Sequence, residues 1–148
     1  MEPHKRNNEF IKELLSKKEG LHLDFKQSLT NPAKIARNIL AFANTEGGTL
    51  VIGASDKGEL IGIDVEEERF MVEQAILNHC RPLVKVGFET FEIDYWEDQK
   101  LPQEKQLLLV HVPKSKEGPH LLDDKKGKLL FFRRIKDKSL LKQVEDYS

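Results

Sequence analysis

Three acidic side chains and one lysine have the types and the spacing of a site for phosphate chemistry. Glu19 precedes a short alternating segment that carries Asp24 and Lys26 on its polar face, and Asp56 follows a buried apolar run. If both segments are neighbouring strands, their ends bring the three carboxylates together. Carboxylate oxygens are the ligands that Mg²⁺ and Mn²⁺ prefer, and such an ion offsets phosphate charge while it activates water. The spacing therefore predicts a divalent-metal site with Glu19, Asp24 and Asp56 as metal ligands and catalytic acids.

The same acids have a plainer interpretation as solvated surface groups. The chain carries 25 Asp and Glu among 148 residues, so acids near strand ends are expected by chance. Asp56 also begins an Asp-Lys-Gly sequence, and aspartate is common in turns because it bonds to nearby backbone. Both interpretations stay open on the residues alone.

A second group combines basic and aromatic residues. It consists of Lys125, Lys126, Lys128 and the run Phe131, Phe132, Arg133, Arg134. Alternate residues of a strand share a face, so one aromatic is expected in the core and one arginine at the surface. Arginine grips phosphate bidentately, and lysines add a salt-sensitive attraction. Together with Lys26, these lysines and arginines predict nucleic-acid contacts, and a charge-protected edge strand is the alternative.

The elements that position these residues include both helices and strands. Helical spacing predicts helices near 10–18, 31–44 and 64–80, the first capped by Asn7 or Asn8 and the others by Asn31 and Asp64. The third helix is expected to turn Phe70, Ile76, Leu77 and Cys80 inward. Strands are expected at 21–26, 49–52, 59–63, 84–95, 106–112 and 128–134, surface loops at 96–105 and 114–126, and a last helix at 140–147.

Glycines punctuate the middle of the chain. Gly47 and Gly48 stand between a helix and a strand, where a positive φ is needed, and Gly53 follows that strand. We interpret all three as structural glycines. The chain contains neither the P-loop sequence nor the dinucleotide-binding glycine pattern, so ATP binding is not supported.

Composition restricts the class of protein. The length predicts one α/β (α+β) domain over residues 1–148, with a mixed, largely antiparallel sheet flanked by helices. The net charge of −1 shows none of the basic excess that is usual in a nucleic-acid-binding protein. From Pro113 onward, however, the chain contains ten Lys or Arg and only six Asp or Glu. The chain has no apolar run long enough for a membrane span, no apparent secretory signal and a single cysteine. These features predict a cytoplasmic protein that does not insert into membranes.

The motif-bearing part, residues 19–62, resembles a known family. Its sequence runs EGLHLDFK, then AFANTEGG, then VIG followed by Asp56 and Gly62, and it resembles the Schlafen AlbA-type DNA-binding domain found in many bacterial proteins. The resemblance extends more loosely to the LLFFRR segment within the basic region 125–138. It implies a nucleic-acid-associated domain and, as in Schlafen nucleases, metal-dependent cleavage of RNA by three acids that fall on Glu19, Asp24 and Asp56. Asp24 is shorter than the usual glutamate, and Ser55 stands where an aspartate is common, so binding without cleavage is also open.

The residues and the resemblance together predict a nucleic-acid-binding domain for RNA or DNA, with Mg²⁺- or Mn²⁺-dependent nuclease activity as the sharper variant. The alternative is a protein-interaction or dimerisation module of a transcriptional regulator whose acids are purely structural. A homodimer that completes a longer groove is a further open expectation.

Overall fold

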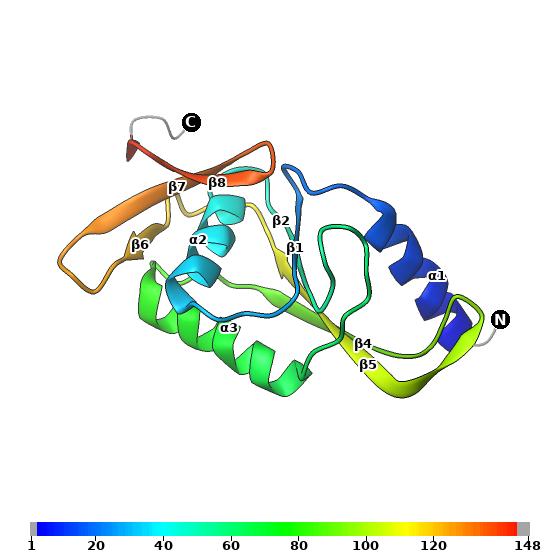
Figure 1. The fold of residues 1–148 in the computed structure, drawn as a ribbon. Coiled ribbons are helices and arrows are strands. Elements are labelled where there is room, and N and C mark those ends of the chain that lie inside the picture. The colour runs from blue at the N-terminus through cyan, green and yellow to red at the C-terminus, as the bar shows by residue number, and fades with distance from the viewer. Residues whose placement is uncertain (1–2, 145–148) are drawn as a thin grey trace.

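The computed structural model describes residues 3–144, and Figure 1 shows them as two sheets with three helices. The helices are α1 (Pro3–Ser16), α2 (Pro32–Ala43) and α3 (Val65–His79). The Asn31 side chain accepts hydrogen bonds from the first turn of α2, and Asp64 accepts one at the start of α3, so both predicted caps are confirmed. The predicted cap of α1 at Asn7 or Asn8 is wrong, because the helix already begins at Pro3.

The first sheet has the strand order β1-β2-β5-β4. Its strands are β1 (Leu23–Lys26), β2 (Gly48–Ile52), β4 (Gly87–Trp96) and β5 (Gln99–Val112). β1 runs parallel to β2, and the other pairs are antiparallel. The β2 segment Leu50–Ile52 is fully buried, as the apolar run predicts for a strand covered on both faces.

The second sheet has the order β3-β6-β7-β8 and is antiparallel throughout. Its strands are β3 (Cys80–Arg81), β6 (Leu121–Asp123), β7 (Leu129–Ile135) and β8 (Lys138–Lys142). The prediction of a mixed, largely antiparallel α/β fold is confirmed, with the strands shared between two sheets. No helix within residues 3–144 is long and apolar enough to cross a membrane.

Two apolar clusters hold these layers together. On one face of the first sheet, α1 packs Ile11, Leu14 and Leu15 against a cluster that includes Val51 and Leu109. On the opposite face, α2 and α3 form a larger cluster that extends to Leu122 and Phe132 of the second sheet. Helix α2 thus contacts both sheets. The residues on its polar face line a cleft together with residues of β1 and β8.

The glycine pair lets the chain pass closely between α2 and β2. Gly47 has a φ of +77°, and a Cβ there would lie 2.8 Å from the carbonyl oxygen of Val112. A Cβ on Gly48 would lie 2.5 Å from the ring of Phe42. Gly53 also has a positive φ, of +110°. The structural role expected for these glycines therefore has a physical basis in positive φ at two of them and close packing at the third.

The predicted inward face of α3 is correct in part. Ile76 and Cys80 are buried as expected, whereas Phe70 and Leu77 are 61% and 54% exposed. Val72 and Ala75 are buried in addition. Glu68 is also buried, and its carboxylate accepts a hydrogen bond of 3.1 Å from the backbone N–H of Leu29. The buried face of α3 therefore includes a carboxylate that bonds to a backbone N–H group. The spacing of apolar residues alone does not predict such a buried acid.

Four other predicted segments differ from the structure. The expected loop 96–105 is largely strand, because Glu97 and Asp98 form a tight turn with φ values of 52° and 64° and β5 begins at Gln99. Segment 59–63 makes a single bridge, from Leu60 to Ala54, in place of a strand. The expected loop 114–126 contains β6, and residues 140–142 of the expected last helix belong to β8. Residues 145–147 of that helix lie outside the described residues.

Candidate functional site

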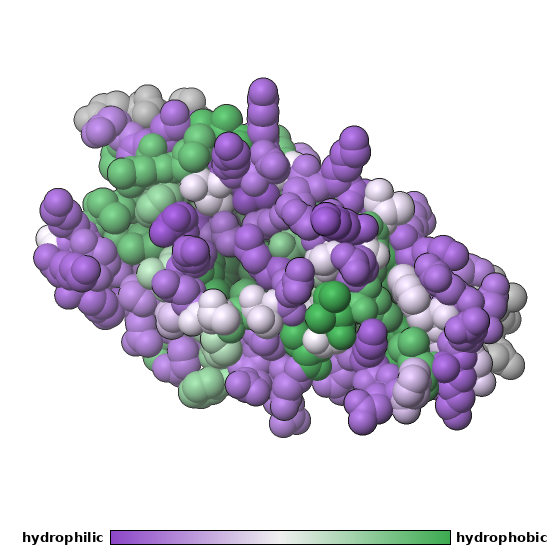
Figure 2. Space-filling view, viewed as in Figure 1, coloured by the Kyte–Doolittle hydropathy of each residue, from purple (hydrophilic) through white to green (hydrophobic). Residues whose placement is uncertain are grey.

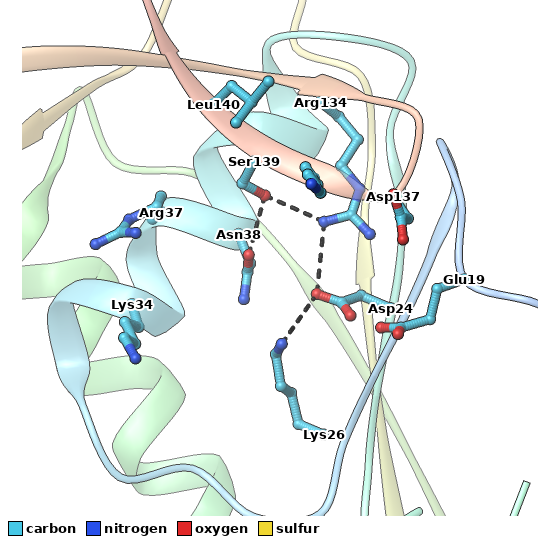
Figure 3. A pocket seen from close by; sticks show the side chains of 11 residues that line it. Glu19, Asp24, Lys26, Lys34, Arg37, Asn38, Arg134, Asp137, Ser139 and Leu140 are labelled. Carbon is cyan, nitrogen blue, oxygen red and sulfur yellow. Dashed lines mark hydrogen bonds and ion pairs between the residues drawn. The ribbon is translucent and has the colours of Figure 1, made fainter. Parts of the chain in front are cut away.

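A cleft of about 480 Å³ opens where β1, α2 and the turn between β7 and β8 meet. Figure 3 shows the side chains that these segments direct toward it. The lining residues are Glu19, Asp24, Lys26, Lys34, Arg37, Asn38, Arg134, Asp137, Lys138, Ser139 and Leu140. Five of them carry positive charge and three carry carboxyl groups, so the cleft combines both signs.

Arg134 forms the centre of the cleft floor. Its side chain is 1% exposed, and its guanidinium donates to the carbonyl oxygens of Gly20 at 3.0 Å and Leu23 at 3.2 Å. It also donates to the Ser139 hydroxyl at 3.1 Å and lies 4.7 Å from the centre of the Phe42 ring. Arg134 therefore ties β7 to the segment before and within β1, and it is too buried to serve as the surface phosphate clamp that was expected.

Asp24 is the buried partner of Arg134. Its side chain is 4% exposed, and one carboxylate oxygen lies 3.5 Å from the Arg134 guanidinium and 3.4 Å from the Lys26 ammonium. A buried carboxylate is costly unless it is paired and hydrogen-bonded. Two cations, one from β1 and one from β7, face Asp24 and offset the cost of burying its charge, as Figure 3 shows.

Glu19 lies beside Asp24 and forms a carboxyl pair with it. The Glu19 carboxylate accepts a hydrogen bond of 3.0 Å from the backbone N–H of Phe25. Burial, reinforced by the side-chain hydrogen bond to Asp24, raises the pKa of Glu19 to about 7. Two of the three predicted acids thus converge, and the raised pKa of Glu19 favours its neutral form beside Asp24.

The rim of the cleft comes from α2 and β8. Lys34, Arg37 and Asn38 have helical i, i+3, i+4 spacing and therefore share one face of α2. The Arg37 guanidinium lies 5.3 Å from the centre of the Phe132 ring. On the other side, Ser139 of β8 donates to the Asn38 side-chain oxygen at 2.9 Å. This hydrogen bond fixes the second sheet against α2.

Asp56 lies outside this cleft, so the expected three-acid cluster is not formed. Its exposed turn folds toward α1, where Gly58 packs close to the carbonyl oxygen of Leu15. α1 covers the face of the first sheet opposite Asp24, because Phe25, the neighbour of Asp24, packs in the α1 cluster. Among the residues described, no group of three or more Asp, Glu, His or Cys could hold a metal ion.

The predicted basic residues near the end of the chain are divided between locations. Lys125, Lys126 and Lys128 are exposed at the tip of the β6–β7 hairpin, whereas the cleft lies at the opposite end of β7 (Figure 1). Arg133 alternates with Arg134 along β7 and does not line the cleft. It borders a second hollow with Arg134, Ile135 and Lys142. Both phenylalanines of the run are buried, although only one was expected in the core.

The surface around the cleft is mostly hydrophilic. Figure 2 shows hydrophilic residues over the middle of the face on which α2 and β1 lie, and hydrophobic residues over β7 and β8. Lys34, Arg37 and Asn38 were not predicted from the sequence as site residues, because only the apolar face of α2 was considered. Their i, i+3, i+4 spacing on its polar face was the available signal.

An α+β domain with a charged cleft between its sheets is thus the class that the fold and the site define. The family model described as Schlafen, AlbA_2 matches residues 19–142, and the chain belongs to this family, which is associated with nucleic-acid binding. That match includes the whole cleft and agrees with the resemblance seen in residues 19–62.

One solved structure has a similar fold. The crystal structure of the DIP2311 protein from Corynebacterium diphtheriae superposes with a TM-score of 0.53 at 18% sequence identity. The similarity covers 95% of this chain and 27% of that protein, so this chain spans about a quarter of its length. At this identity the comparison supports the fold alone.

Proposed function

We propose that the cleft binds the sugar-phosphate backbone of RNA or DNA. The observation that carries this proposal is the gathering of Lys26, Lys34, Arg37 and Lys138 from β1, α2 and β8 around one opening. Phosphate contacts from lysine and arginine supply most of the affinity of non-specific nucleic-acid binding. Membership of the Schlafen AlbA_2 family supports the same ligand class.

The floor of the cleft supports the proposal because its negative charge is largely offset. Asp24 faces the cations of Arg134 and Lys26, and Glu19 takes up a proton near neutral pH. Among residues 3–144, no carboxylate lies within ion-pair distance of the exposed Lys34 or the half-exposed Arg37. Arg37 also rests against the Phe132 ring, which orients its planar guanidinium for a bidentate phosphate contact.

The described acids do not fit the three-carboxylate metal centre that the sequence predicted. Glu19 and Asp24 have oxygen donors suited to Mg²⁺ or Mn²⁺. However, the turn that carries Asp56 packs near α1 and Asp56 does not line the cleft, and one Asp24 oxygen already faces two cations. We therefore propose binding as the function and derive no cleavage step through a metal ion.

The binding proposal is tested by fluorescence anisotropy with labelled single-stranded and duplex RNA and DNA across a salt series. We expect affinity to fall as salt rises, with a smaller slope in the double variant Lys34→Gln, Arg37→Gln, which loses about tenfold in affinity at low salt. Lys12→Gln, Lys17→Gln on and just after α1 is the matched control and should bind as the wild type does. Absence of binding to every probe at low salt would favour the protein-interaction module.

Cleavage is tested separately by incubating the same probes with Mn²⁺. The three-acid hypothesis requires Glu19→Gln, Asp24→Asn and Asp56→Asn to lose activity together. The separation of Asp56 predicts that any cleavage observed is unchanged in Asp56→Asn. Loss of cleavage in all three variants with folding intact would restore the metal-site hypothesis.

A further inference from the structure

A second cavity, of about 260 Å³, lies apart from the cleft and shares no lining residue with it. Its wall includes His120 and Ser115, with Lys85, Lys114 and Lys116 around them. His120 is 3% exposed, and Ser115 is partly exposed to the cavity. Neither the nucleic-acid proposal nor the family motif gives these residues a role.

The hydrogen bonds of His120 define which ring nitrogen carries the proton. Nδ1 lies 2.8 Å from the carbonyl oxygen of Pro82, which can only accept, so Nδ1 is the protonated nitrogen. In the tautomer with Nδ1 protonated, Nε2 is the acceptor. The Ser115 hydroxyl lies 2.6 Å from Nε2 and donates to it.

This arrangement is that of a serine activated by a histidine. A carbonyl holds the imidazole in one tautomer, and the imidazole is positioned to take the hydroxyl proton. The backbone N–H of Glu117 also donates to the Ser115 oxygen at 3.1 Å, which stabilises negative charge developing there. The backbone of His120 is fixed in turn, since its N–H and C=O both bond to the buried Asn44 side chain at 2.8 Å.

We propose that Ser115 is a nucleophile that accepts an acyl group from an activated, negatively charged ester. The Ser115 oxygen bonds to the ester carbon while Nε2 of His120 takes the hydroxyl proton. The bond from that carbon to the leaving oxygen breaks, and the leaving group takes the proton from Nε2. Lys114 is paired with Glu46 at 3.7 Å outside the cavity, and Lys85 and Lys116 outnumber Glu117, the one acid among the lining residues. This excess of positive charge favours an anionic ester over a neutral one.

The proposal is tested with a fluorophosphonate probe, which forms a bond from the serine oxygen to phosphorus and releases fluoride. We expect intact-mass analysis and peptide mapping to find one adduct on Ser115, absent from Ser115→Ala and retained in Ser16→Ala. Ser16 is the matched control, because its exposed hydroxyl donates to a backbone carbonyl at 2.6 Å and not to an imidazole. No adduct at millimolar probe, or an adduct that survives in Ser115→Ala, would overturn the proposal.

Two further measurements separate activation from simple accessibility. His120→Ala should lose the adduct and regain it when imidazole is added, and unchanged labelling of this variant would refute the role of His120. If His120→Ala does not fold, the comparison of wild type with Ser115→Ala still decides. A p-nitrophenyl ester bearing a carboxylate should acylate Ser115 several-fold faster than the neutral acetate, and the reverse order would count against the anionic substrate class.

Discussion

Positive charges gather both in the cleft and at the tip of the β6–β7 hairpin. The cleft draws its cations from β1, α2, β7 and β8, which the fold brings together. At the hairpin tip, Lys125, Lys126 and Lys128 follow one another in the sequence and are exposed. A basic cluster that is obvious in sequence therefore need not be the one that shapes a binding surface.

The two regions also differ in what holds their side chains. In the cleft, Arg134 is buried against Asp24, Ser139 and the Phe42 ring. At the tip, the carboxylates of Asp123 and Asp124 bond to backbone N–H groups of the turn, and these bonds lower the pKa of both carboxyls. At the tip, acidic side chains stabilise the backbone of the turn, whereas in the cleft side chains hold one another in place.

The strongest test of this difference between the cleft and the hairpin tip is to remove the buried cation of Arg134. Arg134→Met leaves the buried Asp24 with Lys26 as its remaining cation, and we expect a loss of about 3–5 kcal/mol in the free energy of unfolding. Urea denaturation followed by circular dichroism measures this loss. Arg69→Met is the matched control, because Arg69 also has an ion pair and an aromatic ring, yet is half-exposed. It should lose about 0.5–1 kcal/mol. Equal losses in the two variants would contradict the central role of Arg134.

A smaller effect should follow from removing the charge of Glu19. Because its pKa rises from 4.5 to about 7 on folding, the folded protein binds more protons than the unfolded chain between these pH values. The free energy of unfolding therefore falls as pH rises through this window. Glu19→Gln should remove about 1 kcal/mol of that fall, after allowance for partial exposure. Thermal melts of both proteins at pH 4.5, 6 and 8 check the slope, and parallel curves would contradict the assignment.

The smallest effect is expected at the hairpin tip. The triple variant Lys125→Gln, Lys126→Gln, Lys128→Gln should change the free energy of unfolding by less than about 0.5 kcal/mol, since these side chains are exposed. Its nucleic-acid affinity should fall only about twofold to threefold at low salt, through loss of long-range attraction. If anisotropy instead shows a larger loss than in the double variant of Lys34 and Arg37, the hairpin tip is the main contact surface.

Local signals predicted much of the fold correctly. The Asn31-Pro32 helix start and the buried run at 50–52 depend on the conformation and burial of adjacent residues, and the structure confirms both. The pairing of Glu19 with Asp24 was also predictable, because the two residues lie close in sequence at one strand.

The rest of the site depends on packing between distant segments. Alternation along β7 separates Arg133 from Arg134, but no local signal shows which of them is buried. Burial of Arg134 requires Asp24, which lies 110 positions earlier in the chain. Likewise, Asp56 follows the expected strand, yet its turn packs near α1, so Asp56 does not reach the cleft.

The glycine pair has a mechanical consequence for the cleft. The ring of Phe42 lies where a Cβ on Gly48 would be, and the guanidinium of Arg134 rests on that same ring. A methyl group at position 48 would displace the ring and, through it, the arginine that orients Asp24. Gly48 does not line the cleft, yet the absence of a side chain at this position fixes the Phe42 ring and, through it, the position of Arg134 in the cleft.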